Sequence, residues 1–425
     1  MLITNLDNGI KVVIESNKYV NSANLGILVK SGSIYESFDK IGISHFIEHM
    51  LFKGTTNRTN RDIAEEIDFI GGQINAFTTK EHTCLYSKVP FNHLTLAVDI
   101  LSDMLMHPLF SPSEIEKEKK VIIEEIKMYN DLPEDIVFEM MSKVMFKNNP
   151  LSYPILGVDD SVKNINYNNI IEYYNERYTP ENIVITISGN VNIDDAIFQL
   201  NEKFSEFTNK HNNLTENLII NYENNKKLEI EGVRKKTEQL HLCFALPYCG
   251  SYSEDYFTGL LVNNYIGGSM SSVLYQTVRE ELGLAYEIES SVETYKEAGA
   301  LEIYVALDAT NASNVLEIIC RVLNDLKDNN MSYHYIEKFK GQLIGNHLLS
   351  VENPFNKMYD NGKELLDIGN VIEDSQILKS INDISIDSVS RFIDKYFNNN
   401  KKFITYVGNI KNKSKFESKI IDILN

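Results

Sequence analysis

The sequence predicts an α+β protein built from two homologous domains, and two observations support this. First, segments with strand-like and helix-like apolar patterns alternate along the chain. Second, short patterns recur at nearly constant spacing. Residues 23–33 are echoed at 241–251, an offset of 218, and residues 115–117 are echoed at 336–338, an offset of 221. We therefore expect two copies of one unit, each a mixed or antiparallel sheet with helices on one side.

The first half carries its elements in a regular order. Asp7-Asn8-Gly9 provides turn chemistry directly before the first strand. Ile63, Ile67 and Ile70 follow helical spacing, and Asn192 is placed to cap a helix. The expected elements are strands over 10–16 and 23–31, a helix over 60–70, a strand–turn–strand unit over 73–89, helices over 92–106 and 114–129, a strand over 183–189 and a helix over 193–205.

A polar segment separates the two halves. Residues 207–227 turn polar, with the runs Thr-Asn-Lys-His-Asn-Asn and Glu-Asn-Asn-Lys-Lys, which is typical of a linker. The strand-like pattern resumes after this segment. The predicted domains are therefore residues 1–215 and residues 228–425.

The composition excludes several classes of protein. The 425 residues include 41 basic and 60 acidic side chains, a net charge of −19. Nucleic-acid binding requires a basic surface, and an anionic membrane would repel such a chain. No stretch approaches the roughly 18 apolar residues of a membrane span. We expect neither a nucleic-acid nor a membrane partner.

Targeting and cysteine patterns point to the cytoplasm. The N-terminal segment has no basic region followed by a long apolar run, and it has no arginine, so it resembles neither a secretory signal nor a transit peptide. The four cysteines show no C-x-x-C spacing, which favours reduced, buried thiols over disulfides or metal ligands.

A His-x-x-Glu-His motif occupies positions 45–49. On a helix, His45 and His49 project from one face, one turn apart, at the spacing that lets two imidazoles bind one metal ion. Glu48 lies on the same side and is better placed to contact a metal-bound water than to act as a ligand. This stripe should face the core, where a bound metal would offset the cost of burying three titratable groups. The alternative interpretation is a pair of solvated or core histidines.

A third protein ligand is expected elsewhere, and the helix over 114–129 offers candidates. Ser113 and Glu116 form a plausible capping box at its start, and the helix should end before Leu132-Pro133. Glu118 and Glu125 are seven residues apart and fall on the seam that should be buried. The alternative is a solvated acidic face. The full seam at helical spacing is Ile115, Glu118, Ile122, Glu125 and Tyr129.

At this point the chain resembles a known family. The motif at 45–49, with Glu125 placed 76 residues after His49, is similar to that of the inverted-motif zinc peptidases of the pitrilysin/insulysin family. The resemblance is closer to the half-length branch that includes mitochondrial processing peptidase. It extends over nearly the whole chain and includes the segments Asn75-Ala76-Phe77-Thr78 and 279–286, the latter reading Arg-Glu-Glu-Leu-Gly-Leu-Ala-Tyr.

The resemblance implies a role for each motif residue. His45, His49 and Glu125 would hold Zn²⁺ and leave one coordination position for water. Glu48 would be the general base, a role that also follows from the acidity of zinc-bound water, whose pKa is about 7. Glu118 matches a second family glutamate that would support the site rather than bind the metal.

Four further residues are implied to handle the substrate. Asn75 and Ala76 match an edge strand along which an extended peptide would lie, held by main-chain hydrogen bonds. Arg279 would bind a substrate carbonyl, and the Tyr286 hydroxyl would stabilise the developing oxyanion. An ordinary surface charge and a core aromatic are the alternatives for this pair. Shifting by 218 places Asn263, Ile266 and Gly267 opposite the three motif residues, so the second half is expected to lack a metal site.

The predicted function is that of a zinc-dependent endopeptidase acting on peptides or unfolded segments. We expect the two halves to pack around a cavity, and the half-length branch implies a homodimer that encloses a chamber. Three alternatives remain: a non-catalytic subunit or scaffold of the same family, a maturation protease dedicated to a leader or bacteriocin-like precursor, and a metal-binding module without hydrolysis. The last of these would not need Glu48.

Overall fold

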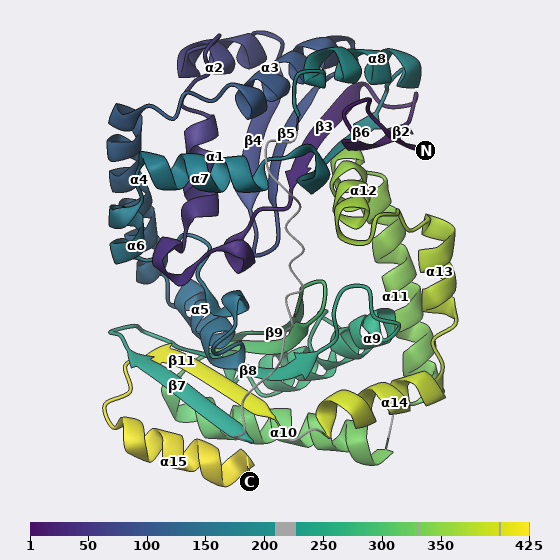
Figure 1. The fold of residues 1–425 in the computed structure, drawn as a ribbon. Helices are drawn as coiled ribbons and strands as arrows, with labels where there is room; N and C mark the ends of the chain where they lie inside the picture. The colour runs from purple at the N-terminus through teal and green to yellow at the C-terminus, as the bar shows by residue number, and fades with distance from the viewer. Residues whose placement is uncertain (209–226, 330, 399–400, 425) are drawn as a thin grey trace. The chain divides into compact units, whose positions relative to one another are not determined.

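The computed structural model describes residues 1–208, 227–329, 331–398 and 401–424 (Figure 1). These residues form two compact α+β units, which confirms the predicted fold class. The first unit contains Met1–Lys127, the described residues within 153–217, and Leu348–Glu373. The second contains Met128–Ser152 and the described residues within 218–347 and 374–425.

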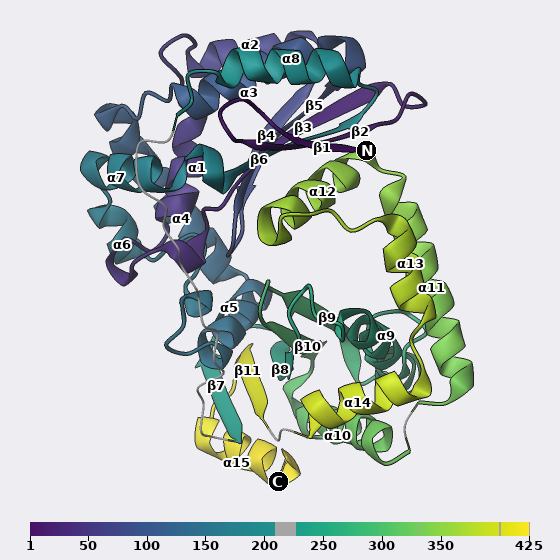
Figure 2. The same ribbon diagram turned by 45° about the vertical axis from the view of Figure 1, so that its right-hand side comes forward.

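The first unit is built on a mixed sheet with the strand order β1-β2-β6-β3-β5-β4 (Figure 2). The β2–β6 pair is parallel, and the other neighbouring pairs are antiparallel. β6 lies inside the sheet and is buried along its whole length, and its residues are mostly apolar, with Thr186 and Ser188 as buried polar exceptions. The strands are β1 Leu2–Asn5, β2 Lys11–Ser16, β3 Ser22–Val29, β4 Gln73–Thr78, β5 Thr83–Pro90 and β6 Ile183–Gly189.

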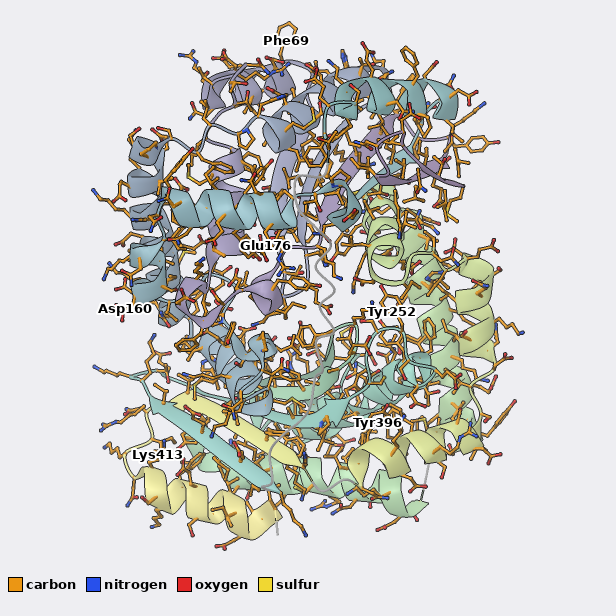
Figure 3. All side chains as sticks on the ribbon, viewed as in Figure 1. Phe69, Asp160, Glu176, Tyr252, Tyr396 and Lys413 are labelled. Carbon is orange, nitrogen blue, oxygen red and sulfur yellow. The ribbon has the colours of Figure 1, made fainter. Side chains whose placement is uncertain are left out.

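Helices cover both faces of this sheet. α3 packs on β3 and β5 and also against α8, while α12 packs on β6, β3 and β2 from the other side (Figure 1). The helices predicted on one side are therefore present, but a helix from the far end of the chain covers the opposite face. At the end of α2, Phe69 points outward and is 92% exposed (Figure 3). The helices of this unit are α1 Ile43–Leu51, α2 Asn60–Phe69, α3 Leu94–Met106, most of α4 Pro112–Asp131, α6 Asp159–Asn164, α7 Tyr167–Arg177, α8 Ile193–Phe204 and α12 Pro354–Ile368.

Small side chains let α12 approach the sheet closely. A Cβ on Gly26 would lie 2.2 Å from the sulfur of Met358, and one on Gly362 would lie 2.6 Å from Leu28 Cδ1. The Thr186 hydroxyl on β6 also donates a hydrogen bond to the carbonyl oxygen of Met358 at 2.8 Å. This contact fixes α12 along the sheet.

The second unit repeats this architecture. Its sheet order, β7-β11-β8-β10-β9, corresponds to β2-β6-β3-β5-β4 of the first, and β7–β11 is again parallel. Helix α5, Pro133–Met145, packs on β11 and β8 in the place that α12 takes in the first unit. The Thr405 hydroxyl donates to the carbonyl oxygen of Val137 at 2.8 Å, as Thr186 does to Met358. The same hydrogen bond at equivalent strand positions supports the internal duplication.

The remaining elements belong mainly to the second unit. The strands are β7 Leu228–Arg234, β8 Leu240–Tyr248, β9 Ala285–Thr294, β10 Gly299–Leu307 and β11 Lys402–Gly408. The helices are α9 Tyr256–Ile266, a π-helix over Tyr275–Glu281, α10 Ala312–Asn329, α11 Tyr333–Val351, α13 Asp374–Asn382, α14 Ile386–Phe397 and α15 Lys413–Leu424. Among the described helices, none combines the length and the apolar character that crossing a membrane requires.

The compact units exchange helices between the two halves of the chain. The predicted domains, 1–215 and 228–425, are contiguous, whereas α5 belongs to the second compact unit and α12 to the first. A linker can be predicted from composition. The exchange of α5 and α12 cannot, because it depends on which of the two sheets the apolar face of each helix packs against. Of the predicted linker over 207–227, residues 209–226 lie outside the described part of the chain.

The predicted elements of the first half are found with small shifts in their ends. The Asn192 side chain caps α8 by accepting hydrogen bonds from the backbone N–H groups of Asp194 and Asp195. The capping box predicted at Ser113 is wrong, because α4 already begins at Pro112 and runs to Asp131. Proline suits the first helical position, since its fixed φ matches the helix and its missing N–H would have no partner there.

Candidate metal centre

Helix α1 carries the His-x-x-Glu-His motif. Its apolar residues pack into the core of the first unit. His45 and His49 face glutamates of α4, and Glu48 faces Thr78 at the end of β4. The helix begins after Gly42, whose φ of 93° is left-handed. A Cβ there would lie 2.7 Å from the Cα of Gly157, so glycine is required for both the conformation and the close approach.

A buried carboxylate holds the start of this helix. Glu36 accepts hydrogen bonds from the backbone N–H groups of Gly42 at 2.7 Å and Ser44 at 2.8 Å. Burial raises the pKa of Glu36 to about 7, although these hydrogen bonds act in the opposite direction. A carboxylate at a helix N-terminus satisfies free N–H groups and complements the helix dipole. Glu36 therefore fixes the beginning of the helix that carries the motif.

Helix α4 brings the third ligand candidate to the two histidines. Ile115, Glu118 and Ile122 are buried along its inner seam, and Glu125 is half-buried one turn further on, as the spacing predicted. Tyr129, expected on the same seam, is 41% exposed, because the seam leaves the core in the last turn.

The three predicted ligands converge. One ligand atom from each of His45, His49 and Glu125 lies within 4.8 Å of the others. Glu125 Oε2 is 3.9 Å from His45 Nε2 and 3.7 Å from His49 Nε2. These separations exceed hydrogen-bond length, so the atoms face one another without bonding directly. Among the described residues, no other group of His, Cys, Asp and Glu has this arrangement.

This donor set fits zinc. Zinc bonds of about 2.0–2.2 Å in tetrahedral geometry separate neighbouring N and O ligands by about 3.4 Å, slightly less than the distances found here. Burial, together with the charge of His49, lowers the pKa of His45 to about 3, so this ring is neutral and able to donate an electron pair. The group expected from the sequence would be held by the Nε2 atoms of His45 and His49 and the carboxylate of Glu125.

Glu118 supports the site from behind His49. Its Oε1 is 2.8 Å from His49 Nδ1, the ring nitrogen that faces away from Glu125. Burial acts to raise the pKa of Glu118, but hydrogen bonds from His49 and Lys53 lower it overall, which keeps it ionised. A carboxylate on the second nitrogen of a ligating histidine fixes the ring orientation and its tautomer. The geometry fits the supporting role predicted for Glu118.

Glu48 lies beside the converging ligands. Burial raises the pKa of its carboxyl group above the ordinary value, while a hydrogen bond from Thr78 opposes the increase. The Thr78 hydroxyl donates to Glu48 Oε2 at 2.5 Å. A carboxyl group with a raised pKa is better able to take a proton from water and to return it, which is the property of a general base.

The predicted substrate strand forms an open edge of the sheet. Asn75 and Ala76 lie on β4, the last strand in the sheet order, and β4 packs beside α1. The Asn75 side chain accepts a hydrogen bond from the backbone N–H of Ala76 at 2.9 Å. An edge strand presents free N–H and C=O groups to an extended peptide. Peptide binding along β4 remains a prediction.

Arg279 and Tyr286 belong to the second unit. Arg279 lies in the π-helix, with its guanidinium carbon 5.0 Å from the ring centre of Tyr275. Tyr286 lies on β9 and is 71% exposed, so the alternative of a core aromatic is excluded. Their roles at the metal centre remain predictions.

Sequence reasoning assigned no role to three residues that contact the site. Thr78 was recognised only as part of a motif. Lys53, which forms an ion pair with Glu118 at 2.7 Å, lies four residues after His49, just beyond the end of α1, so its spacing was a usable signal. Glu36 gave no comparable signal, because its contact with the start of α1 depends on the fold of the intervening turn.

Comparisons with known proteins agree with this arrangement. Residues 11–159 match the family described as Insulinase (Peptidase family M16), and residues 164–343 match the Peptidase M16 inactive domain. The chain is 38% identical over 390 residues to YmxG of Bacillus subtilis (strain 168), described as an uncharacterized zinc protease, with 92% of this chain and 94% of that protein covered. It is 31% identical over 395 residues to the uncharacterized zinc protease ML0855 of Mycobacterium leprae (strain TN), with 93% and 89% covered.

Solved structures share the fold. A crystal structure of a protease from Helicobacter pylori superposes with a TM-score of 0.89 at 17% identity, covering 96% of this chain and 99% of that one. A Peptidase M16 inactive domain structure from Pseudomonas fluorescens gives a TM-score of 0.88, also at 17% identity, covering 96% and 98%.

The fold and the centre define a protein of the zinc peptidase class. The chain belongs to peptidase family M16, as a half-length member with a metal centre in the first of its two repeated units. The family resemblance found in the sequence is confirmed, and so is zinc as the expected metal.

Proposed function

We propose that this chain is a zinc-dependent endopeptidase that cleaves peptides or unfolded segments. The observation that carries the proposal is the convergence of His45, His49 and Glu125, with Glu48 beside them. The zinc proteases among its relatives and the open edge strand β4 support it. An extended peptide added to β4 would be held through its main chain, which suits varied sequences.

Zinc held by His45, His49 and Glu125 would supply Lewis-acid activation of water and of a peptide carbonyl. The residues of the chain supply the rest. Glu48 takes the proton of the attacking water on a carboxylate oxygen and then passes it to the leaving amine nitrogen. Glu118 holds the His49 ring in position throughout. In this proposal Arg279 binds a substrate carbonyl and the Tyr286 hydroxyl donates to the developing oxyanion.

The proposal extends to assembly and compartment. A homodimer that encloses a chamber would admit flexible peptides and exclude folded proteins. The compartment proposed is the cytoplasm, and the unpaired state of all four cysteines supports a reducing environment. Size-exclusion chromatography with light scattering tests the homodimer, and a monomer at working concentration would contradict it.

The decisive experiment compares the wild-type protein with Glu48→Gln. Bound zinc is quantified in both, and both are incubated with a mixture of unstructured quenched-fluorescent peptides. Zinc in both and cleavage only by the wild type is the expected result, because the substituted amide side chain cannot accept the proton. Zinc in both without cleavage in either would favour a scaffold or a protease dedicated to one precursor. A wild-type protein that binds no zinc would contradict the ligand assignment.

A further inference from the structure

The Glu48 carboxylate is held by very few contacts. Among the described residues, the Thr78 hydroxyl is its one hydrogen-bond donor, at 2.5 Å from Oε2. The other oxygen, Oε1, receives no hydrogen bond from the described side chains and backbone. Glu48 is only 8% exposed, so solvent does little to restrain it. The orientation of this carboxylate therefore depends on one hydroxyl group.

The hydrogen bonds of Thr83 leave the Thr78 hydroxyl hydrogen available for Glu48. Thr83, which pairs with Thr78 across the β4–β5 ladder, donates its hydroxyl to the carbonyl oxygen of Ser31 at 2.8 Å. The two threonine hydroxyl oxygens are 3.3 Å apart, a longer contact than that between Thr78 and Glu48. Thr78 has a single hydroxyl hydrogen, and the short contact to an acidic group takes it.

The backbone that carries Thr78 is fixed on its far side. In the turn after β4, Thr79 N–H donates to the His82 carbonyl oxygen at 2.8 Å, and Thr79 Oγ1 accepts from His82 N–H at 3.0 Å. His82 Nε2 is 2.8 Å from the Tyr359 hydroxyl on α12. The Phe77 ring also contacts the Tyr359 ring, at 5.3 Å between centres. The substrate edge strand and α12 thus form a rigid frame behind the Thr78 hydroxyl.

We propose that Thr78 is the positioning residue of the general base: its hydroxyl fixes Glu48 Oε2 so that Oε1 remains available for the proton of the attacking water. This inference rests on the proposed endopeptidase function. It also couples the substrate strand to the chemistry, because the residue that ends β4 is the one that orients Glu48. A peptide bound along β4 would stabilise the strand whose last residue, Thr78, orients Glu48.

The test uses three substitutions in the full chain. Thr78→Val keeps the β-branched shape and removes the hydroxyl, whereas Thr78→Ser keeps the hydroxyl. Thr294→Val is the matched control, because Thr294 ends β9, the strand that takes the place of β4 in the second sheet. Zinc content, kcat and KM on the quenched-fluorescent peptide mixture are measured for each.

We expect Thr78→Val to lower kcat by about 10- to 100-fold with little change in KM or zinc content, since small misplacements of a catalytic group have effects of this order. Thr78→Ser should recover most of the loss, and Thr294→Val should match the wild type. A Thr78→Val protein within about twofold of the wild type would overturn the proposal. So would an equal loss in Thr78→Ser, because the missing methyl group would then be the cause.

A second measurement does not depend on activity. The melting temperature of the metal-free protein is compared for Thr78→Val in the wild-type and the Glu48→Ala backgrounds. A shift that disappears when Glu48 is truncated supports the contact, and equal shifts in both backgrounds overturn it. If the wild-type protein cleaves no peptide, the proposed function fails by itself, and this comparison still decides whether Thr78 holds Glu48.

Discussion

The buried carboxylate at the start of α1 makes the stability of the first unit depend on pH. Glu36 is enclosed, and burial raises its pKa to about 7 from an ordinary value of 4.5. Between these two pH values the folded protein keeps a proton that the unfolded chain has already lost. The stabilising effect of this proton is complete below pH 4.5 and is lost as the pH rises through about 7.

The size of the effect follows from the two pKa values. At about 1.4 kcal/mol per pKa unit, the difference corresponds to about 3 kcal/mol. Glu36→Gln has no titrating group at this position. The free energy of unfolding of the wild type minus that of Glu36→Gln should therefore fall by about 3 kcal/mol as the pH rises from 4.5 through about 7. Groups that titrate equally in both proteins cancel in this difference.

The assay is thermal unfolding of both proteins without metal, across this pH range. For a unit of about 150–250 residues, each kcal/mol corresponds to roughly 2–4 °C in melting temperature. The gap between wild type and Glu36→Gln should thus change by several degrees, in the direction that disfavours the wild type as the pH rises. A gap that stays constant from pH 4.5 to about 7, or that moves the other way, would refute the reasoning.

Three further predictions follow from other contacts. Glu118→Gln should weaken zinc binding by about 10- to 100-fold, measured by competition with a chelator, because it removes the carboxylate behind His49; unchanged affinity would contradict its supporting role. Gly26→Ala should destabilise the protein by about 1–3 kcal/mol in thermal unfolding, since its Cβ would lie 2.2 Å from the Met358 sulfur, whereas Gly341→Ala on α11 meets nothing within 4 Å and should be neutral or stabilising. Tyr359→Phe should cost about 1–3 kcal/mol, because it leaves the buried Nε2 of His82 without its partner; an unchanged melting temperature would show that water replaces the hydroxyl.

Much of the fold could be predicted because the relevant signals are local. Each predicted element of the first half rests on apolar spacing and turn residues within a few positions. On α2, for example, Ile63 and Ile67 are buried at the predicted helical spacing. The capping box predicted at Ser113 was wrong because another local signal competed with it. Pro112, which suits the first helical position, determined the start of α4. The exchange of α5 and α12 had no local signal, because either apolar helix face could pack on either sheet.

The metal ligands were predictable from spacing and family resemblance. His45 and His49 lie one helical turn apart, and Glu125, like Glu118, interrupts the apolar seam of α4, so each carries a mark in the linear sequence. The contacts of Thr78 and Glu36 carry no such mark. Each joins segments separated by turns whose course is determined only when β4, β5 and α1 pack together.

The sequence by itself determined the two-unit α+β class, the order of the elements, the metal-binding residue types and the family, because periodicity and motif spacing are properties of the chain. Tertiary structure alone decided the reciprocal exchange of α5 and α12, the distances among the three ligand atoms, and the hydrogen bond from Thr78 to Glu48. These features depend on close packing between distant segments, such as Gly26 against Met358, for which no local pattern exists.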